Sequence, residues 1–194
     1  MVRTARAGIC LLSCLFFLVC CGCDESNSGI KTKDNSLYTR FNLHYVTQKD
    51  SNVASYANLT DYPGHNVLPY NTKVEVKSWK RGYRITAVDT GIVILFDYKS
   101  QNMDGMRGSD YLDLILSPEP VSYMGLAAED EQGIQQGKAM KGMTKQGVMI
   151  ALGYPAKHRT PSLDENTWAY WKGRLGDPRL VQFDGNGKVV SISR

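Results

Sequence analysis

Short runs of alternating apolar and polar residues dominate the chain from Leu37 and predict β-strands. The clearest are "LYTRFNLHYV", "TKVEVKSW", "YRITAV" and "IVILFDY", and Asp89 to Gly91 form a tight-turn signal between the last two. Ser109 is expected to cap a short helix through "DYLDLIL" that ends before Pro118. Strands this short and closely spaced predict a small β-barrel with one covering helix.

A helical pattern follows in "KGMTKQGVMIALGYP", where Thr144 is a good N-cap and Gly153 a stop signal. Val148 and Leu152 give this helix an apolar stripe. A shorter helix is expected before it, in "EDEQGIQQG", and three strands after it, in "NTWAYWK", "RLVQFD" and "KVVSIS". The pattern predicts two helices packed on a three-stranded antiparallel sheet, so the fold class expected for the chain is α+β.

The aromatic residues of the first of these strands point to two faces. Trp168 and Tyr170 share a face and are expected to pack against the helix pair. Trp171 points the other way, beside Arg174, where core burial and an exposed contact surface both remain open. Exposed aromatic and arginine side chains often anchor protein interfaces, so Trp171, Arg174 and Tyr154 are the candidate partner-binding residues.

The first residues have the layout of a secretory signal. Arg3 and Arg6 precede the apolar run "AGICLLSCLFFLVCC", which is short for a transmembrane span and is closed by polar sequence. An uncleaved amphipathic or anchoring helix is the alternative. All five cysteines lie at or before Cys23.

The motif "CCGC" resembles the lipobox of bacterial lipoproteins, in which the last cysteine carries the lipid. Cys23 is therefore the expected anchor, with Gly22 before it, and Cys21 is the alternative. Two or more acyl chains give stable anchoring, so a lipid bilayer is one expected partner. The predicted organisation is a signal peptide at 1–22, a flexible polar tether at 23–36, a β-rich domain at 37–120 and an α+β domain at 129–194.

Charge and motifs argue against several functional classes. The chain has 23 Lys and Arg against 19 Asp and Glu, and removal of the signal would leave a net charge of about +2. No long basic stripe occurs, so nucleic acid is not an expected partner. His44, His65 and His158 lack metal-site spacing, and the turn-like "YPGHN" indicates that His65 is an ordinary surface or turn histidine. Without a nucleophile elbow or phosphate-binding loop, no enzyme activity, cofactor or metal is expected.

Two resemblances follow from these segments. The region from Ile134 to Ile192 resembles the SmpA/OmlA (BamE-like) family of outer-membrane assembly lipoproteins. The positions that carry this resemblance are Ile134, Gly142, Met143, Thr144, Val148, Ala151, Leu152, Gly153, Pro155, Asn166, Thr167, Trp168, Tyr170, Phe183, Gly187 and Ile192. Gly147 stands where that family often has a Gln that completes the cap, so a weaker helix start is expected. The segment "LPYNTKVEV" loosely resembles bacterial SH3-like domains.

The family resemblance implies a non-enzymatic envelope lipoprotein that faces the periplasm and binds another envelope protein, with a role in outer-membrane assembly or integrity. A cell-wall or ligand-binding module working through the SH3-like unit is one alternative. An inhibitor of a periplasmic hydrolase is another, because the helix-pair-on-sheet fold is similar to that of β-lactamase-inhibitor proteins. Asp24 after the lipidated cysteine retains proteins in the inner membrane of enteric bacteria, but the outer membrane remains the preferred location.

Overall fold

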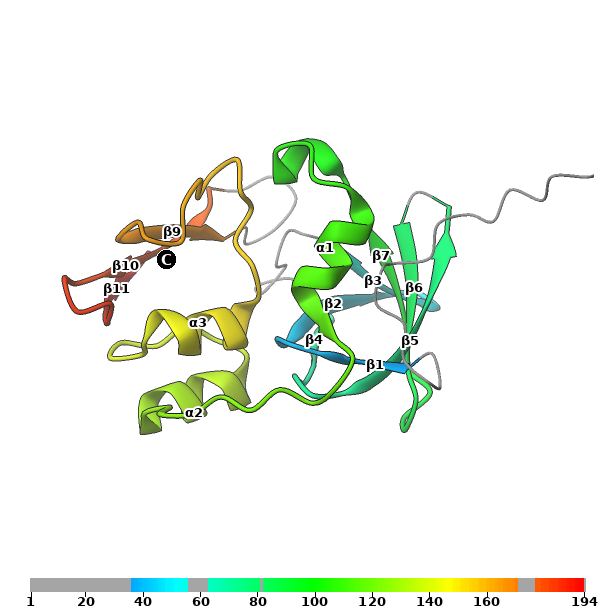
Figure 1. The fold of residues 1–194 in the computed structure, drawn as a ribbon, viewed down its shortest axis with the longest axis horizontal. Helices are drawn as coiled ribbons and strands as arrows, with labels where there is room; N and C mark the ends of the chain where they lie inside the picture. Colours follow the sequence, from blue (N-terminus) through cyan, green and yellow to red (C-terminus); the bar gives the residue numbers. More distant parts are fainter. Residues whose placement is uncertain (1–35, 56–62, 81, 171–176, 194) are drawn as a thin grey trace, which may run out of the picture.

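The computed structural model describes residues 36–55, 63–80, 82–170 and 177–193, and Cys23 therefore lies outside the described residues (Figure 1). Its elements, in chain order, are β1 (Ser36–Thr39), β2 (Leu43–Gln48), β3 (Ser51–Ser55), β4 (His65–Leu68), β5 (Lys73–Trp79), β6 (Gly82–Ala87), β7 (Val93–Asp97), the 3-10 helix η1 (Ser100–Met103), α1 (Gly108–Ile115), β8 (Leu116–Ser117), α2 (Ala128–Gln136), α3 (Lys145–Leu152), β9 (Thr167–Tyr170), β10 (Arg179–Phe183) and β11 (Val189–Ile192). No helix among these residues is both long and apolar enough to cross a bilayer.

The first eight strands form one curled sheet in the order β4-β2-β3-β7-β6-β5-β1-β8. Neighbouring strands are antiparallel except β3 and β7, which run parallel with Asn52 opposite Ile94. The sheet curls into a half barrel, and α1 lies against its concave side (Figure 1). Ile85 and Phe96 of the sheet and Tyr111 of α1 are buried in the shared core, where the Phe96 and Tyr111 rings stack at 5.6 Å.

The predicted SH3-like barrel is wrong. The hairpin expected at 89–91 is present, because Gly91 has φ +69° and donates its N–H to the Ala87 carbonyl oxygen at 2.9 Å. The strands on either side of this hairpin, however, belong to an eight-stranded sheet whose strand order differs from that of a small barrel. Its β1 lies between β5 and β8, and its β3 pairs with β7 across the intervening β4, β5 and β6. The alternating pattern located strands but could not show which distant strands pair.

The second sheet has the order β11-β10-β9 and packs against α3, with α2 on the other side of that helix (Figure 1). Trp168 and Tyr170 are buried with Val148 and Leu152, so the predicted burial of this aromatic face is confirmed. Trp168 also donates its indole N–H to the Leu163 carbonyl oxygen at 3.2 Å. The aromatic face therefore belongs to the core of this part of the chain.

Helix α3 is buried on all sides rather than along one stripe. Every residue from Gly147 to Leu152 is buried, as expected for a helix enclosed by other elements. The Asn42 backbone N–H, just before β2, donates to the Ile150 carbonyl oxygen at 2.9 Å, and Phe41 packs against both hydrophobic cores. The half barrel thus covers the side of α3 that a separate two-layer domain would leave to solvent.

The fold class predicted from sequence is accordingly wrong. The described structure is mostly β, with an eight-stranded mixed half barrel, a three-stranded sheet and three α-helices. A small barrel followed by a two-helix layer domain would need two independent units. Here the segment that enters β2 is hydrogen-bonded to α3. A local sequence pattern cannot predict such a long-range contact.

The expectation of a weak start for α3 is also wrong, because a buried carboxylate supports the cap. Asp130 of α2 accepts the Thr144 backbone N–H at 2.7 Å and the Thr144 hydroxyl at 3.1 Å. Its carboxylate also accepts the Ala127 N–H at the start of α2, at 3.1 Å. A Cβ at Gly147 would lie 2.0 Å from the Asp130 Oδ1 atom. Glycine at 147 therefore makes room for a carboxylate that serves two helix N-termini.

Candidate functional site

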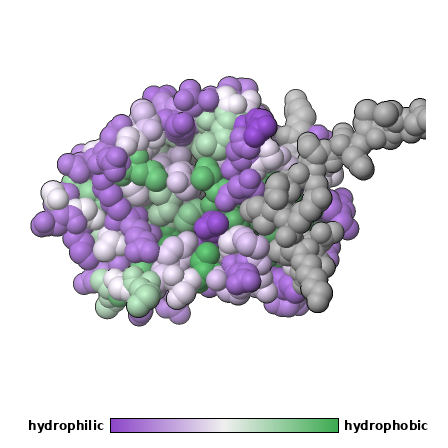
Figure 2. All heavy atoms as spheres, viewed as in Figure 1, coloured by the Kyte–Doolittle hydropathy of each residue, from purple (hydrophilic) through white to green (hydrophobic). Residues whose placement is uncertain are grey.

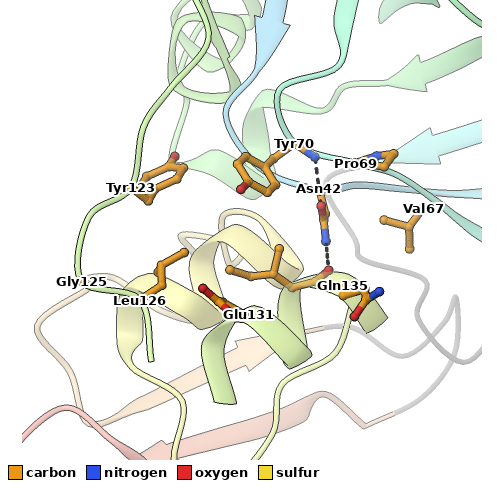
Figure 3. A pocket seen from close by; sticks show the side chains of 10 residues that line it. Asn42, Val67, Pro69, Tyr70, Tyr123, Gly125, Leu126, Glu131 and Gln135 are labelled. Atoms are coloured by element: carbon orange, nitrogen blue, oxygen red, sulfur yellow. Dashed lines mark hydrogen bonds between the residues drawn. The ribbon is translucent and has the colours of Figure 1, made fainter. Parts of the chain in front are cut away.

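A cleft of about 710 Å³ lies at the junction of the half barrel and α2 (Figure 3). We call it the tyrosine cleft. Three segments form its walls: the end of β4 with the turn after it, the segment between β8 and α2, and α2 itself. Its lining residues are Asn42, Val67, Pro69, Tyr70, Tyr123, Gly125, Leu126, Glu131, Ile134 and Gln135.

Hydrogen bonds hold the two tyrosines of the cleft in place. The Tyr123 hydroxyl donates to the Arg40 carbonyl oxygen at 2.9 Å, and burial raises the pKa of this phenol. The Asn71 side chain fixes the segment before Tyr123, donating to the Val121 carbonyl oxygen at 2.8 Å and accepting the Val121 N–H at 2.7 Å. The Tyr70 and Tyr123 rings lie 6.0 Å apart at a tilt of 59°. The cleft therefore presents preformed aromatic surfaces.

Asn42 forms the floor of the cleft and joins its walls (Figure 3). It is buried, and its Nδ2 donates to the Ile134 carbonyl oxygen of α2 at 2.7 Å. Its Oδ1 accepts the Tyr70 backbone N–H at 3.0 Å. Both ends of the amide are thus used within the protein. We conclude that Asn42 shapes the cleft rather than binding a ligand directly.

The groups left for a ligand are the aromatic surfaces, an apolar wall and two polar side chains on α2. Leu126 and Ile134 supply the apolar wall. Glu131 and Gln135 are exposed, and neither side chain bonds to any residue that the structure describes. Glu131 carries the one formal charge among the described lining residues. Such a surface suits an apolar group accompanied by a cation.

A pair of histidines lies beside α3, between the half barrel and the helix. The His44 Nε2 lies 2.7 Å from the Ala151 carbonyl oxygen, so this nitrogen carries the proton and donates. Its Nδ1 lies 2.8 Å from the His65 Nε2, and in neutral His44 it accepts from that nitrogen. The rings stack at 5.1 Å. His65 begins β4 directly after the turn at 63–64, and it is half-buried.

Burial lowers the pKa of His44 from 6.5 to about 4. The hydrogen bond to Ala151 opposes this shift, and the charge of His65 adds to it. Both ring nitrogens of His44 are occupied, so this histidine links the sheet to α3 and is not placed to exchange a proton with a substrate. Among the described residues, no cluster of three or more metal-ligating side chains occurs.

Tyr154, one of the predicted partner-binding residues, does not line the tyrosine cleft. It is half-buried, with its ring edge-on to Phe41 at a centroid distance of 5.8 Å. Among the pockets that it lines are two smaller apolar grooves, of about 320 Å³ and 230 Å³, and Tyr123 also lines the larger of these. Figure 2 shows hydrophobic atoms gathered in the middle of one face, between α1 and the chain leaving α3, where the smaller groove lies. Trp171 and Arg174 lie outside the described residues.

Sequence reasoning missed the tyrosine cleft. Tyr70 and Tyr123 lie outside every strand and helix, where no periodicity marks a residue for a site. One signal was available in "FNLHY", where the polar Asn42 interrupts an apolar run at the entry to a strand. A polar residue at such a buried position needs hydrogen-bond partners, and those of Asn42 are backbone groups of Ile134 and Tyr70 in the walls of the cleft.

Comparison with known proteins adds no relative: no protein-family model, no curated protein and no solved structure matches this chain.

Proposed function

We propose that this chain is a lipid-anchored, non-enzymatic protein of the bacterial envelope whose folded part binds an extended segment of another envelope protein. The tyrosine cleft is the observation that carries the proposal. It is preformed and lined by aromatic and apolar side chains, as binding sites commonly are. Its occupant is a peptide segment that combines apolar side chains with Lys or Arg. The apolar side chains would contact the apolar wall, and the Lys or Arg would pair with Glu131, the charged residue that lines the cleft.

The envelope location rests on the sequence. The basic start, the short apolar run and the motif ending in Cys23 support export and lipidation. The resemblance of residues 134–192 to the SmpA/OmlA family supports a scaffold role and a preference for the outer membrane. A polar tether at 23–36 would hold the folded part away from the bilayer, within reach of a partner.

The absence of catalytic activity is proposed from the chemistry of the cleft. Among the described residues that line it there is no histidine, cysteine, serine or lysine. His44, whose pKa is lowered by burial, has both nitrogens engaged with protein groups. Binding, rather than covalent or acid–base chemistry, is what this surface supports.

A photo-crosslinking amino acid introduced at an exposed position of the cleft tests the proposal. We choose Gln135 in the cleft and Gln182, exposed on β10 in the second sheet, as the matched control. Cross-linking in intact envelopes should give a defined protein adduct from Gln135 and none from Gln182. Mass spectrometry should place the adduct in a segment with apolar and basic residues, and Leu126→Arg should abolish it. Identical adducts from both positions would overturn the proposal.

A cell-wall saccharide is a second candidate occupant. The Tyr70 and Tyr123 rings, with the carboxylate of Glu131 and the amide of Gln135, could stack on and hydrogen-bond to sugar rings. The same cross-linking experiment separates the two candidates. A glycan adduct at Gln135 that muramidase digestion removes would favour the saccharide, whereas a protease-sensitive adduct would favour the peptide.

A further inference from the structure

We propose that the partner segment binds as an additional β-strand on the free edge of β4, hydrogen-bonded to the backbone of Val67. This inference rests on the proposed function, because it specifies how a peptide would occupy the tyrosine cleft. Among the described residues, β4 is an outermost strand of the half barrel, and it pairs with β2 alone. Val67 also lines the cleft, so the strand edge and the cleft form one continuous surface.

The register of β4 and β2 shows which backbone groups face outward. The Thr47 N–H donates to the Gly64 carbonyl oxygen at 2.9 Å, and this pair continues the register in which His44 lies opposite Val67. Hydrogen-bonded pairs alternate with non-hydrogen-bonded pairs along an antiparallel ladder. Counting from Thr47 and Gly64, the pair of His44 and Val67 is non-hydrogen-bonded. The N–H and C=O of Val67 are therefore directed away from β2, toward the free edge.

These two groups have no hydrogen-bond partner among the residues that the structure describes. An edge strand with free donors and acceptors is a template for another strand. Strand addition of this kind gains affinity from main-chain bonds and specificity from alternate side chains. The edge is short, because β4 ends at Leu68 and Pro69, which follows it, has no N–H. A long ladder of identical chains is thereby disfavoured, and the side-chain cleft must supply much of the affinity.

The added strand would direct alternate side chains into the cleft. A partner residue directly opposite Val67 lies on the same face of the sheet as the Val67 side chain, which lines the cleft. We expect an apolar residue at that position, where Ile134 provides the wall. A basic residue elsewhere in the segment would pair with Glu131. Side chains at the two adjacent partner positions point to the opposite face and tolerate substitution.

The test uses the purified full-length lipoprotein in detergent micelles. Nine-residue peptides are selected for binding from a random displayed library, and those that Leu126→Arg no longer binds are retained. Each backbone nitrogen of a retained peptide is then methylated in turn, which removes one N–H without changing a side chain. Strand addition predicts that affinity falls at least about tenfold when methylation blocks the nitrogen that donates to the Val67 carbonyl oxygen. This nitrogen belongs to the residue opposite Val67 in an antiparallel strand and to the next residue in a parallel strand. Methylation of the nitrogens on either side of it should leave the affinity nearly unchanged.

A protein variant provides the matching test. Val67→Pro removes the outward N–H while leaving the ladder to β2 intact, and Pro is tolerated at such edge positions. Val67→Pro should lower the affinity for the retained peptides by at least about tenfold. Val67→Ala keeps the backbone N–H and should lower the affinity less. The methylation scan uses the unchanged protein, so it remains decisive if Val67→Pro does not fold.

The outcomes separate this inference from the proposed function. Peptides that depend on Leu126 but tolerate methylation at every nitrogen would overturn strand addition and leave peptide binding in the cleft intact. A library that yields no peptide dependent on Leu126 would overturn the proposed function itself. Two results together would support both the inference and the proposed function. Methylation of one central nitrogen, but not of its neighbours, would weaken peptide binding, and Val67→Pro would weaken it as well.

Discussion

Acidification should destabilise the protein through His44. This imidazole is 3% exposed, and burial lowers its pKa to about 4 from 6.5, the value expected in the unfolded chain. As the pH falls below 6.5, the unfolded chain therefore binds a proton before the folded protein does. The stabilising contribution of neutral His44 is fully present above pH 6.5 and is lost progressively as the pH approaches 4.

The size of the effect follows from the shift. Each pKa unit corresponds to about 1.4 kcal/mol, so complete protonation removes about 3 kcal/mol from the free energy of unfolding. At pH 5 the same two pKa values give a loss of about 2 kcal/mol relative to pH 7.5. The free energy of unfolding of a typical domain is only about 5–15 kcal/mol, so a loss of this size is readily measured.

Urea denaturation at pH 7.5 and pH 5.0, followed by tryptophan fluorescence, measures this loss. His44→Gln is the control, because its amide can donate to the Ala151 carbonyl oxygen, as the His44 Nε2 does, but does not titrate. The unchanged protein should lose about 2 kcal/mol more than His44→Gln between the two pH values. Equal losses in the two proteins would refute the assignment of the pH dependence to His44.

Four further substitutions probe other parts of the molecule. Gly147→Ala should lower the free energy of unfolding by about 1–3 kcal/mol in urea melts, because the new Cβ would lie 2.0 Å from the Asp130 carboxylate; unchanged stability would show that Asp130 can move. Trp168→Ala should cost about 3–5 kcal/mol, whereas Trp171→Ala should leave the melting temperature unchanged and weaken capture of an envelope partner; the reverse pattern would move the contact surface to Trp168. Cys23→Ser should abolish palmitate labelling and release the protein from membranes, and labelling that persists would place the lipid on another cysteine.

Local signals in the sequence located many elements correctly. The hairpin at 89–91 and the helix after Thr144 depend on residues close in the chain, namely a turn glycine and a hydroxyl that accepts the Gly147 N–H. The burial of Trp168 followed from strand alternation in the same way. Each of these features is decided by neighbours within a few residues, and the amino-acid pattern records such preferences directly.

The pairing of the sheet and the tyrosine cleft could not be predicted in this way. The parallel contact of β3 with β7 depends on how the whole half barrel curls, and either strand alone fits many partners. The cleft unites Asn42, Tyr70, Tyr123 and Glu131 from four separate segments. The burial of Asn42 is explained by its hydrogen bonds to the Ile134 carbonyl oxygen and the Tyr70 backbone N–H, and both residues lie far from Asn42 in the sequence.

The position of β1 between β5 and β8 affects how the chain reaches its native state. β1, the first strand of the described residues, finds its second partner, Leu116–Ser117, only after the eight elements between them in the chain have been made. A contact between residues distant in sequence forms only after a large loop has closed, and this closure costs conformational entropy. Proteins rich in such contacts therefore fold slowly. A chain that emerges from its N-terminus must leave the edge of β1 open until β8 arrives, and we expect its apolar strands to need protection from aggregation during that interval.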